Sequence, residues 1–72
     1  MVKWTQAEGE LVTRTLLGLG DRLAVEAFLA RVYGLRASRE AEDVCLYGGP
    51  ESGWLRVRYH RDRPIAAVRI TQ

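Results

Sequence analysis

Two spacings of hydrophobic residues divide the chain, a helical repeat in the first half and strict alternation in the C-terminal third. Thr5 and Glu8 fit a capping box, so a first helix is expected to begin there. Gly18 and Gly20 favour its end, because glycine readily adopts the left-handed conformation common at helix C-termini. The apolar and small residues expected to form its buried stripe are Trp4, Ala7, Leu11, Val12, Thr15, Leu16 and Leu19.

A second helix is expected over Arg22–Tyr33, where Asp21 can cap the start and Gly34 can end it. Its apolar residues run nearly all the way round, and such a helix is covered on more than one side. One neighbouring helix and a small sheet offer too little cover, so a second subunit could supply the rest. The residues expected to form this self-association surface are Leu23, Ala27, Ala30 and Tyr33.

The second half of the chain predicts strands. Residues 54–60 and 65–71 alternate between apolar and polar side chains, and residues 43–48 form a shorter apolar run. Polar residues 35–43 are expected to form a loop or a short helical turn. The glycine-rich residues 48–53 are typical of a loop.

Helices followed by sequential strands indicate an α+β fold. We expect two N-terminal helices packed on one face of a three-stranded antiparallel β-meander (ααβββ), as a single domain over residues 1–72. Alternation then assigns the faces of the last two strands. The residues expected to point toward the helices are Leu55, Val57, Tyr59, Ala66, Val68 and Ile70. Those expected on the opposite face are Trp54, Arg56, Arg58, His60, Ile65, Ala67 and Arg69.

Composition limits how the fold is stabilised. The chain has 72 residues, of which 47% are hydrophobic and 28% charged, values typical of a globular protein. A chain this short buries only about 60% of the surface that its unfolded form exposes. One cysteine, Cys45, forms no internal disulfide, and with a single histidine, His60, it closes no structural zinc site. No metal or cofactor is therefore expected, and association with a second copy or a larger protein partner remains as a source of stability.

The expected cellular location follows from the lack of targeting signals in the sequence. No uninterrupted apolar run has the length of a signal peptide, and none approaches the roughly 20 residues that span a bilayer. We therefore expect a reducing, cytoplasmic setting and no membrane partner.

Charge is unevenly distributed. The formal net charge is +2, but residues 1–53 carry six basic and eight acidic side chains, and residues 54–72 carry five arginines and one aspartate. A basic strand with an aromatic residue can grip phosphates and stack on bases, so nucleic acid is a possible partner. The same side chains also suit a protein contact, and ordinary solvent cover is the simplest interpretation of them. The residues of this partner-binding surface are Trp54, Arg56, Arg58, Arg61, Arg63 and Arg69.

Catalytic patterns are weak throughout. Cys45 lies in an apolar strand, His60 lies near a bend, and neither comes with an orienting third group. The acidic residues Glu40, Glu42 and Asp43 suit a solvated loop, and the second helix is too apolar for a DNA recognition helix. No catalytic residue is therefore expected.

Two functions remain from the sequence. The first is a non-catalytic protein-interaction module that self-associates and acts as an adaptor or as an inhibitor of a larger partner. The alternative is a nucleic-acid-binding module that uses the basic, Trp-containing face of the C-terminal hairpin.

Overall fold

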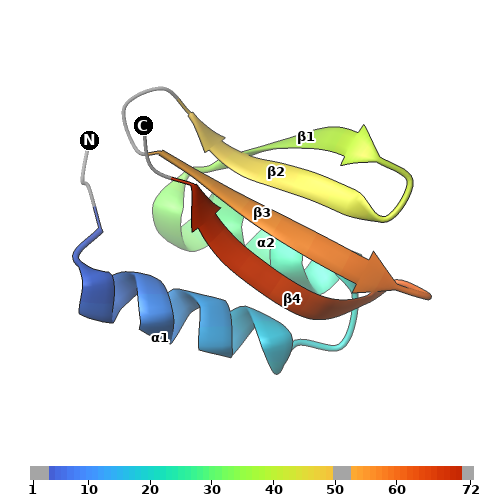
Figure 1. Ribbon diagram of the computed structural model, residues 1–72, viewed down its shortest axis with the longest axis horizontal. Coiled ribbons are helices and arrows are strands. Elements are labelled where there is room, and N and C mark those ends of the chain that lie inside the picture. The colour runs from blue at the N-terminus through green and yellow to red at the C-terminus, as the bar shows by residue number, and fades with distance from the viewer. Residues whose placement is uncertain (1–3, 50–52, 71–72) are drawn as a thin grey trace.

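The computed structural model describes residues 4–49 and 53–70 as two helices and a four-stranded sheet (Figure 1). The helices are α1 (Gln6–Leu17) and α2 (Arg22–Tyr33). The strands are β1 (Arg36–Ala41), β2 (Val44–Gly49), β3 (Gly53–His60) and β4 (Arg63–Ile70). The α+β class is confirmed, with one strand more than the sequence predicted.

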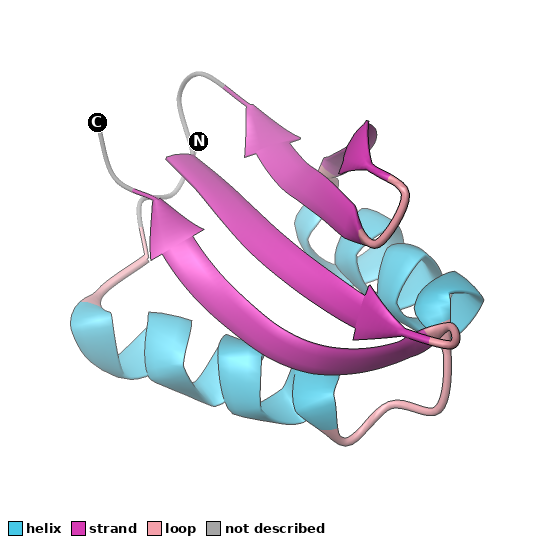
Figure 2. Cartoon of the chain, turned by 45° about the vertical axis from the view of Figure 1, so that its right-hand side comes forward, coloured by secondary structure: helices cyan, strands magenta, loops and turns pink. Residues whose placement is uncertain are grey.

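The molecule has two layers. All neighbouring strands pair antiparallel in the order β1-β2-β3-β4, so the sheet is a simple meander. Both helices lie on the same face of this sheet, with α1 running along β4 and α2 beside it (Figures 1 and 2). The other face of the sheet has no helix over it, and we call it the outer face.

The helix boundaries follow from local capping. The Thr5 hydroxyl accepts a hydrogen bond from the Glu8 amide at 3.1 Å, and the Thr5 amide donates to the Glu8 carboxylate at 2.9 Å, which confirms the capping box. The hydrogen bond from the Thr5 amide lowers the pKa of Glu8. The Asp21 carboxylate accepts from the Ala24 amide at 2.8 Å and so caps α2. Gly34 ends α2 in the left-handed conformation (φ 67°).

Strand β1 corrects the prediction for residues 35–43. The segment was expected to be a loop because it is polar, but it pairs with β2 from Arg36, opposite Gly48, to Ala41, opposite Val44. All six of its residues are exposed, so the strand lacks the hydrophobic alternation by which strands are usually recognised. It forms because its backbone pairs with β2 at the edge of the sheet. A register shift between Arg39 and Ala41 also interrupts the edge, which hinders pairing with another chain.

The hydrophobic core lies between the helices and the inner face of the sheet. Its buried members within residues 4–49 and 53–70 are Val12, Leu16, Val25, Leu29, Leu35, Cys45, Tyr47, Leu55, Val57 and Tyr59. The prediction for β3 is confirmed, since Leu55, Val57 and Tyr59 are buried while the alternating Arg56, Arg58 and His60 are exposed.

The buried stripe of α1 is rotated from the predicted one. Gly9, Val12 and Leu16 are buried, whereas Ala7, Leu11 and Thr15 are exposed, Leu11 at 59%. The rotation brings Gly9 against β4. A Cβ atom at Gly9 would lie 2.5 Å from Cδ of Arg69, so the absence of a side chain makes room for this arginine.

The prediction for β4 is wrong about the faces of most of its residues. In the pairing with β3, Arg69 lies opposite Leu55 and Ala67 lies opposite Val57, so both are on the helix side. The residues that were expected there lie on the outer face instead: Ala66, Val68 and Ile70.

The reversal has a local cause near the β3–β4 turn. Arg61 and Asp62 both have positive φ (48° and 72°), as in a two-residue hairpin turn, and Tyr59 then pairs with Pro64. The next pair is Arg58 with Ala66, which leaves Ile65 as an extra residue in a bulge. One inserted residue exchanges the two faces for the rest of the strand.

Candidate functional site

The outer face carries a mixture of aliphatic and charged side chains. The register places Leu46, Arg56 and Val68 side by side across β2, β3 and β4. The next pairs place Val44, Arg58 and Ala66 in a second row of the same kind. The apolar residues of the outer face are Val44, Leu46, Trp54, Ala66, Val68 and Ile70. Its charged or titratable residues are Arg36, Glu40, Arg56, Arg58, His60 and Arg63.

Exposure differs among these apolar residues. Val68 is 58% exposed, while Leu46, Trp54 and Ile70 are partly buried among their neighbours. An antiparallel sheet that faces water on one side usually alternates hydrophobic inward and polar outward. This sheet instead keeps aliphatic side chains on both faces.

Two arginines occupy the middle of the outer face. Nε of Arg56 lies 3.0 Å from one carboxylate oxygen of Glu40, and its NH2 donates to the other at 3.3 Å. Arg58 makes no ion pair within residues 4–49 and 53–70, although it lies in the same central strand. The middle of the outer face therefore presents one guanidinium held by a carboxylate and one that has no ion pair among the described residues.

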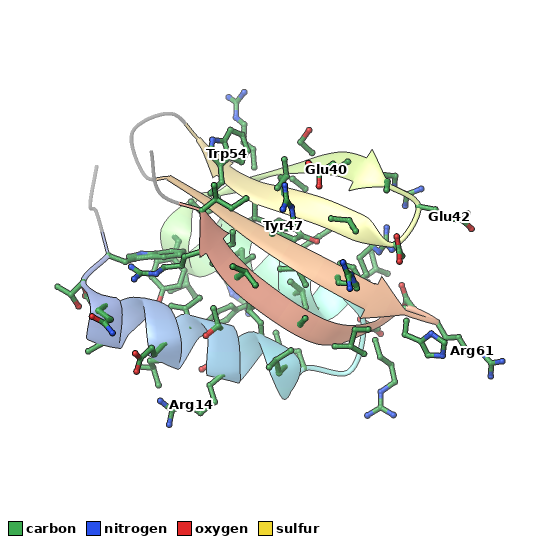
Figure 3. All side chains as sticks on the ribbon, in the orientation of Figure 1. Arg14, Glu40, Glu42, Tyr47, Trp54 and Arg61 are labelled. Atoms are coloured by element: carbon green, nitrogen blue, oxygen red, sulfur yellow. The ribbon has the colours of Figure 1, made fainter. Side chains whose placement is uncertain are left out.

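The other predicted partner-binding residues separate in space. Trp54, Arg56 and Arg58 do lie together on the outer face. Arg63 lies beside His60 at the start of β4, and Arg61 lies in the β3–β4 turn, at the opposite end of the sheet from Trp54 (Figure 3). These two positions are at or beyond the margin of the face.

Arg69 does not belong to the outer face. It lies on the helix side, where its NH1 donates to the carbonyl oxygens of Trp4 and Thr5, both at 3.3 Å. It therefore joins the end of β4 to the start of α1. The sequence prediction failed here because it assumed uninterrupted alternation.

Sequence reasoning missed two features of the face. Leu46 and Val68 lie beside Arg56, and neither was assigned to the partner-binding surface. A signal for the bulge was present, since Pro64 lies two residues after the turn and a proline offers no amide to the strand ladder.

The predicted self-association surface lies on the exposed side of α2. Leu23 is 73% exposed, and Ala27 and Ala30 are exposed as well. Tyr33 is different, because its ring packs edge-to-face on Trp4 (centroids 5.1 Å apart) and on Phe28 (5.9 Å). Three of the four predicted residues are therefore open to a contact, while Tyr33 helps to hold α2 against the segment before α1.

A recess of about 530 Å³ opens near the start of α2. Its lining residues are Arg22, Glu42, Asp43, Tyr59, Arg61 and Asp62. The Arg22 guanidinium lies 4.4 Å from the centre of the Tyr59 ring and donates to the Glu42 carbonyl at 3.1 Å. Its Nε lies 3.9 Å from the Asp62 carboxylate. These contacts tie α2 to two turns of the sheet, which is a structural role.

Two tyrosines on the inner face share a buried hydrogen bond. The hydroxyl oxygens of Tyr47 and Tyr59 are 2.6 Å apart. Burial raises the pKa of Tyr59 to about 12 and raises the pKa of Tyr47 as well, so both hydroxyls remain protonated near neutral pH. The neighbouring thiol of Cys45 is also buried.

The described residues contain neither a metal-binding cluster nor a membrane-spanning helix. In residues 4–49 and 53–70, no cluster of three His, Cys, Asp or Glu side chains could hold a metal ion. No helix in this part of the chain is long and apolar enough to cross a membrane.

Comparisons of the chain with protein-family models, curated proteins and solved structures found no match. Its function is therefore inferred from its own surface.

Proposed function

We propose that the chain is a small non-catalytic protein-interaction module that acts as an adaptor or inhibitor by binding a larger protein through the outer face. The observation that carries this proposal is the exposure of Val68 among other aliphatic residues on a sheet face that no described element covers. Exposed apolar side chains that gather on one face of a protein are typical of protein-interaction sites.

Ordinary solvent cover explains the face less well. A solvated sheet face needs only polar side chains, and the arginines Arg36, Arg56 and Arg58 would serve that purpose. Removing the neighbouring aliphatic residues from water lowers the free energy by roughly 25 cal/mol per Å² of apolar surface buried. A protein partner would supply that burial.

A second candidate function is nucleic-acid binding, favoured by Trp54 lying on the same face as Arg56 and Arg58. Two observations weigh against it as the first choice. Arg56 is already paired with Glu40, and Arg69, predicted to join the basic face, is turned to the helices. Trp54 is also the single aromatic ring of the described outer face besides the imidazole of His60, whereas single-stranded binders stack successive bases on several rings.

Self-association remains a prediction for the exposed side of α2. Leu23 projects from a helix whose neighbouring exposed positions, Ala27 and Ala30, are small enough for a second helix to approach closely. A dimer formed there would be isologous and would leave both outer faces free. Sedimentation velocity should show a dimer for the natural sequence and a monomer for Leu23→Asp.

Co-purification from cells of the source organism tests the proposed function. The tagged protein is compared with Val68→Asp on the outer face and with Leu11→Asp, a matched control that places the same charge at an equally exposed position on α1. We expect a partner that is retained by the natural sequence and by Leu11→Asp and lost with Val68→Asp. Circular dichroism checks that both variants remain folded. Identical sets of retained proteins for all three chains would contradict the proposal.

A further inference from the structure

We infer that the partner of the outer face is an acidic protein segment whose carboxylates are set among aliphatic side chains, and that it is not a second copy of this chain. The inference rests on the proposed function and gives the chemistry of its partner. It follows from the arrangement of charge on the face, from the contact made by Glu40 and from the residues that flank the arginines.

The arginines lie inside the apolar surface rather than around it. Arg56 pairs with Leu46 on one side and Val68 on the other, and Arg58 pairs with Val44 and Ala66 in the same way. Positions two residues apart on a strand are roughly 7 Å apart on the same face. A partner that covers the aliphatic residues therefore also covers both guanidinium groups.

A covered guanidinium needs an acceptor. Removing an arginine from water without a partner is strongly unfavourable, whereas a carboxylate can accept two parallel hydrogen bonds from it. Arg58 has no such acceptor within the described residues. The partner must bring a carboxylate to this position.

Glu40 illustrates how a partner's carboxylate would contact Arg58. Its two oxygens accept from Arg56 in the fork geometry that a partner's carboxylate would use at Arg58. Because Glu40 belongs to the exposed edge strand β1, it also competes with any partner carboxylate that approaches Arg56. Removing its charge should therefore strengthen binding.

Charge argues against a second copy on this face. Four arginines and one glutamate leave an excess of three positive charges on the outer face; the arginines are Arg36, Arg56, Arg58 and Arg63. Two copies stacked sheet on sheet about 10 Å apart would bring these central arginines toward each other. Like charges opposed in an interface cost free energy and bring no carboxylate to Arg58.

Nucleic acid would match only the charged part of the outer face. Phosphates would accept from Arg56 and Arg58, but the aliphatic side chains of Leu46 and Val68 would then lie against sugars and phosphates. An acidic and aliphatic protein segment satisfies both kinds of side chain at once. Affinity should then depend on Val68 as well as on Arg58.

The test uses a designed helical peptide of leucine, alanine and glutamate as the probe. Its binding is followed by fluorescence anisotropy for the natural sequence and for Arg58→Gln, Val68→Ser, Glu40→Gln and the control Leu11→Ser, an exposed position on α1. We expect Arg58→Gln and Val68→Ser each to weaken binding by roughly tenfold. Glu40→Gln should strengthen binding severalfold, and Leu11→Ser should leave it unchanged.

Three further probes test which ligand chemistry the outer face prefers. One peptide has lysine in place of every glutamate, one has serine in place of every leucine, and the third is single-stranded oligothymidylate. Neither control peptide should bind as tightly as the acidic, aliphatic one. Equal binding of the lysine peptide, tighter binding of oligothymidylate, or no binding of the acidic peptide at millimolar concentration would overturn the inference.

Failure of the inference can be told apart from failure of the proposed function. If the partner recovered by co-purification is lost with Val68→Asp but is held equally well by Arg58→Gln and Glu40→Gln, the outer face is still a protein-binding surface. Only the acidic chemistry of the partner would then be wrong.

Discussion

Strands β3 and β4 are paired neighbours with similar alternating sequences, yet they follow the alternation differently. β3 points Leu55 and Val57 into the core, as its pattern predicts. β4 points Ala67 and Arg69 to the helix side and exposes Val68. Alternation thus determines which residues share a face, but the register at the hairpin determines which face that is.

The difference matters for function because it changes which β4 residues lie on the outer face. Uninterrupted pairing would have placed Ala66, Val68 and Ile70 in the core and Ile65, Ala67 and Arg69 on the outer face. The bulge at Ile65 instead sets Ala66 beside Arg58 and Val68 beside Arg56, and it turns Arg69 to the helices. The outer face thereby holds Val68 and Ile70 and loses the Arg69 guanidinium group.

The largest expected effect comes from a matched valine in each strand. Val57→Ala removes buried methyl groups and should lower the free energy of unfolding by about 2–3 kcal/mol. Val68→Ala removes the same groups from an exposed position and should change it by less than about 0.5 kcal/mol. Urea denaturation measures both. Equal losses would mean that the two strands do not differ as described.

A pH-dependent loss of stability should follow from the buried hydroxyls behind β3. The pKa of Tyr59 rises from 10.0 to about 12 on folding, and the pKa of Tyr47 rises too. Above pH 10 the unfolded chain releases these protons first, so stability is complete below pH 10 and declines as the pH rises toward 12.

Urea titrations between pH 9 and 12 check this prediction. The double variant Tyr47→Phe/Tyr59→Phe removes both hydroxyls and leaves no unpaired partner, so it should flatten the decline. A decline of the same steepness in the double variant would assign the effect to other groups.

A smaller effect tests how β4 meets α1. Gly9→Ala should gain about 1 kcal/mol from helix propensity, but the new Cβ displaces Arg69. In the background Arg69→Ala the full gain should appear. A double-mutant cycle by urea denaturation should therefore give a coupling of about 0.5–1 kcal/mol. Strict additivity would show that Arg69 does not lie against Gly9.

The smallest effect concerns the ion pair on the outer face. Glu40→Ala should cost about 0.2–1 kcal/mol at low salt and less at high salt, since the pair is partly exposed. Arg58→Ala, which breaks no ion pair among the described residues, is the control and should cost less. Thermal unfolding at two salt concentrations distinguishes the two variants.

The parts of the fold that depend on local sequence were predicted well. The caps at Thr5 and Asp21 involve residues three apart, so the sequence alone locates both helices. β1 was missed because an exposed edge strand is stabilised by hydrogen bonds to β2 and needs no hydrophobic pattern. Its existence depends on pairing, which periodicity does not encode.

The candidate site shows the same division between features that local sequence predicts and features that depend on strand pairing. Trp54, Arg56 and Arg58 lie on one strand, so alternation alone groups them. Leu46 and Val68 join them only through register, and Arg69 leaves the group for the same reason. A surface that spans several strands requires knowledge of how each strand is offset from the next.

The contacts of Arg22 have a consequence for kinetics. This side chain reaches the carbonyl of Glu42 and the sulfur of Cys45, which follow it by 20 and 23 residues, and it also approaches Asp62 in the last hairpin. All of these contacts require the first turn of α2 and two hairpins to be in place, so they should form after the rate-limiting step of folding. Stopped-flow measurements on Arg22→Ala should then show faster unfolding with a nearly unchanged refolding rate. The Arg22 guanidinium would in that case lengthen the lifetime of the native state by slowing its unfolding.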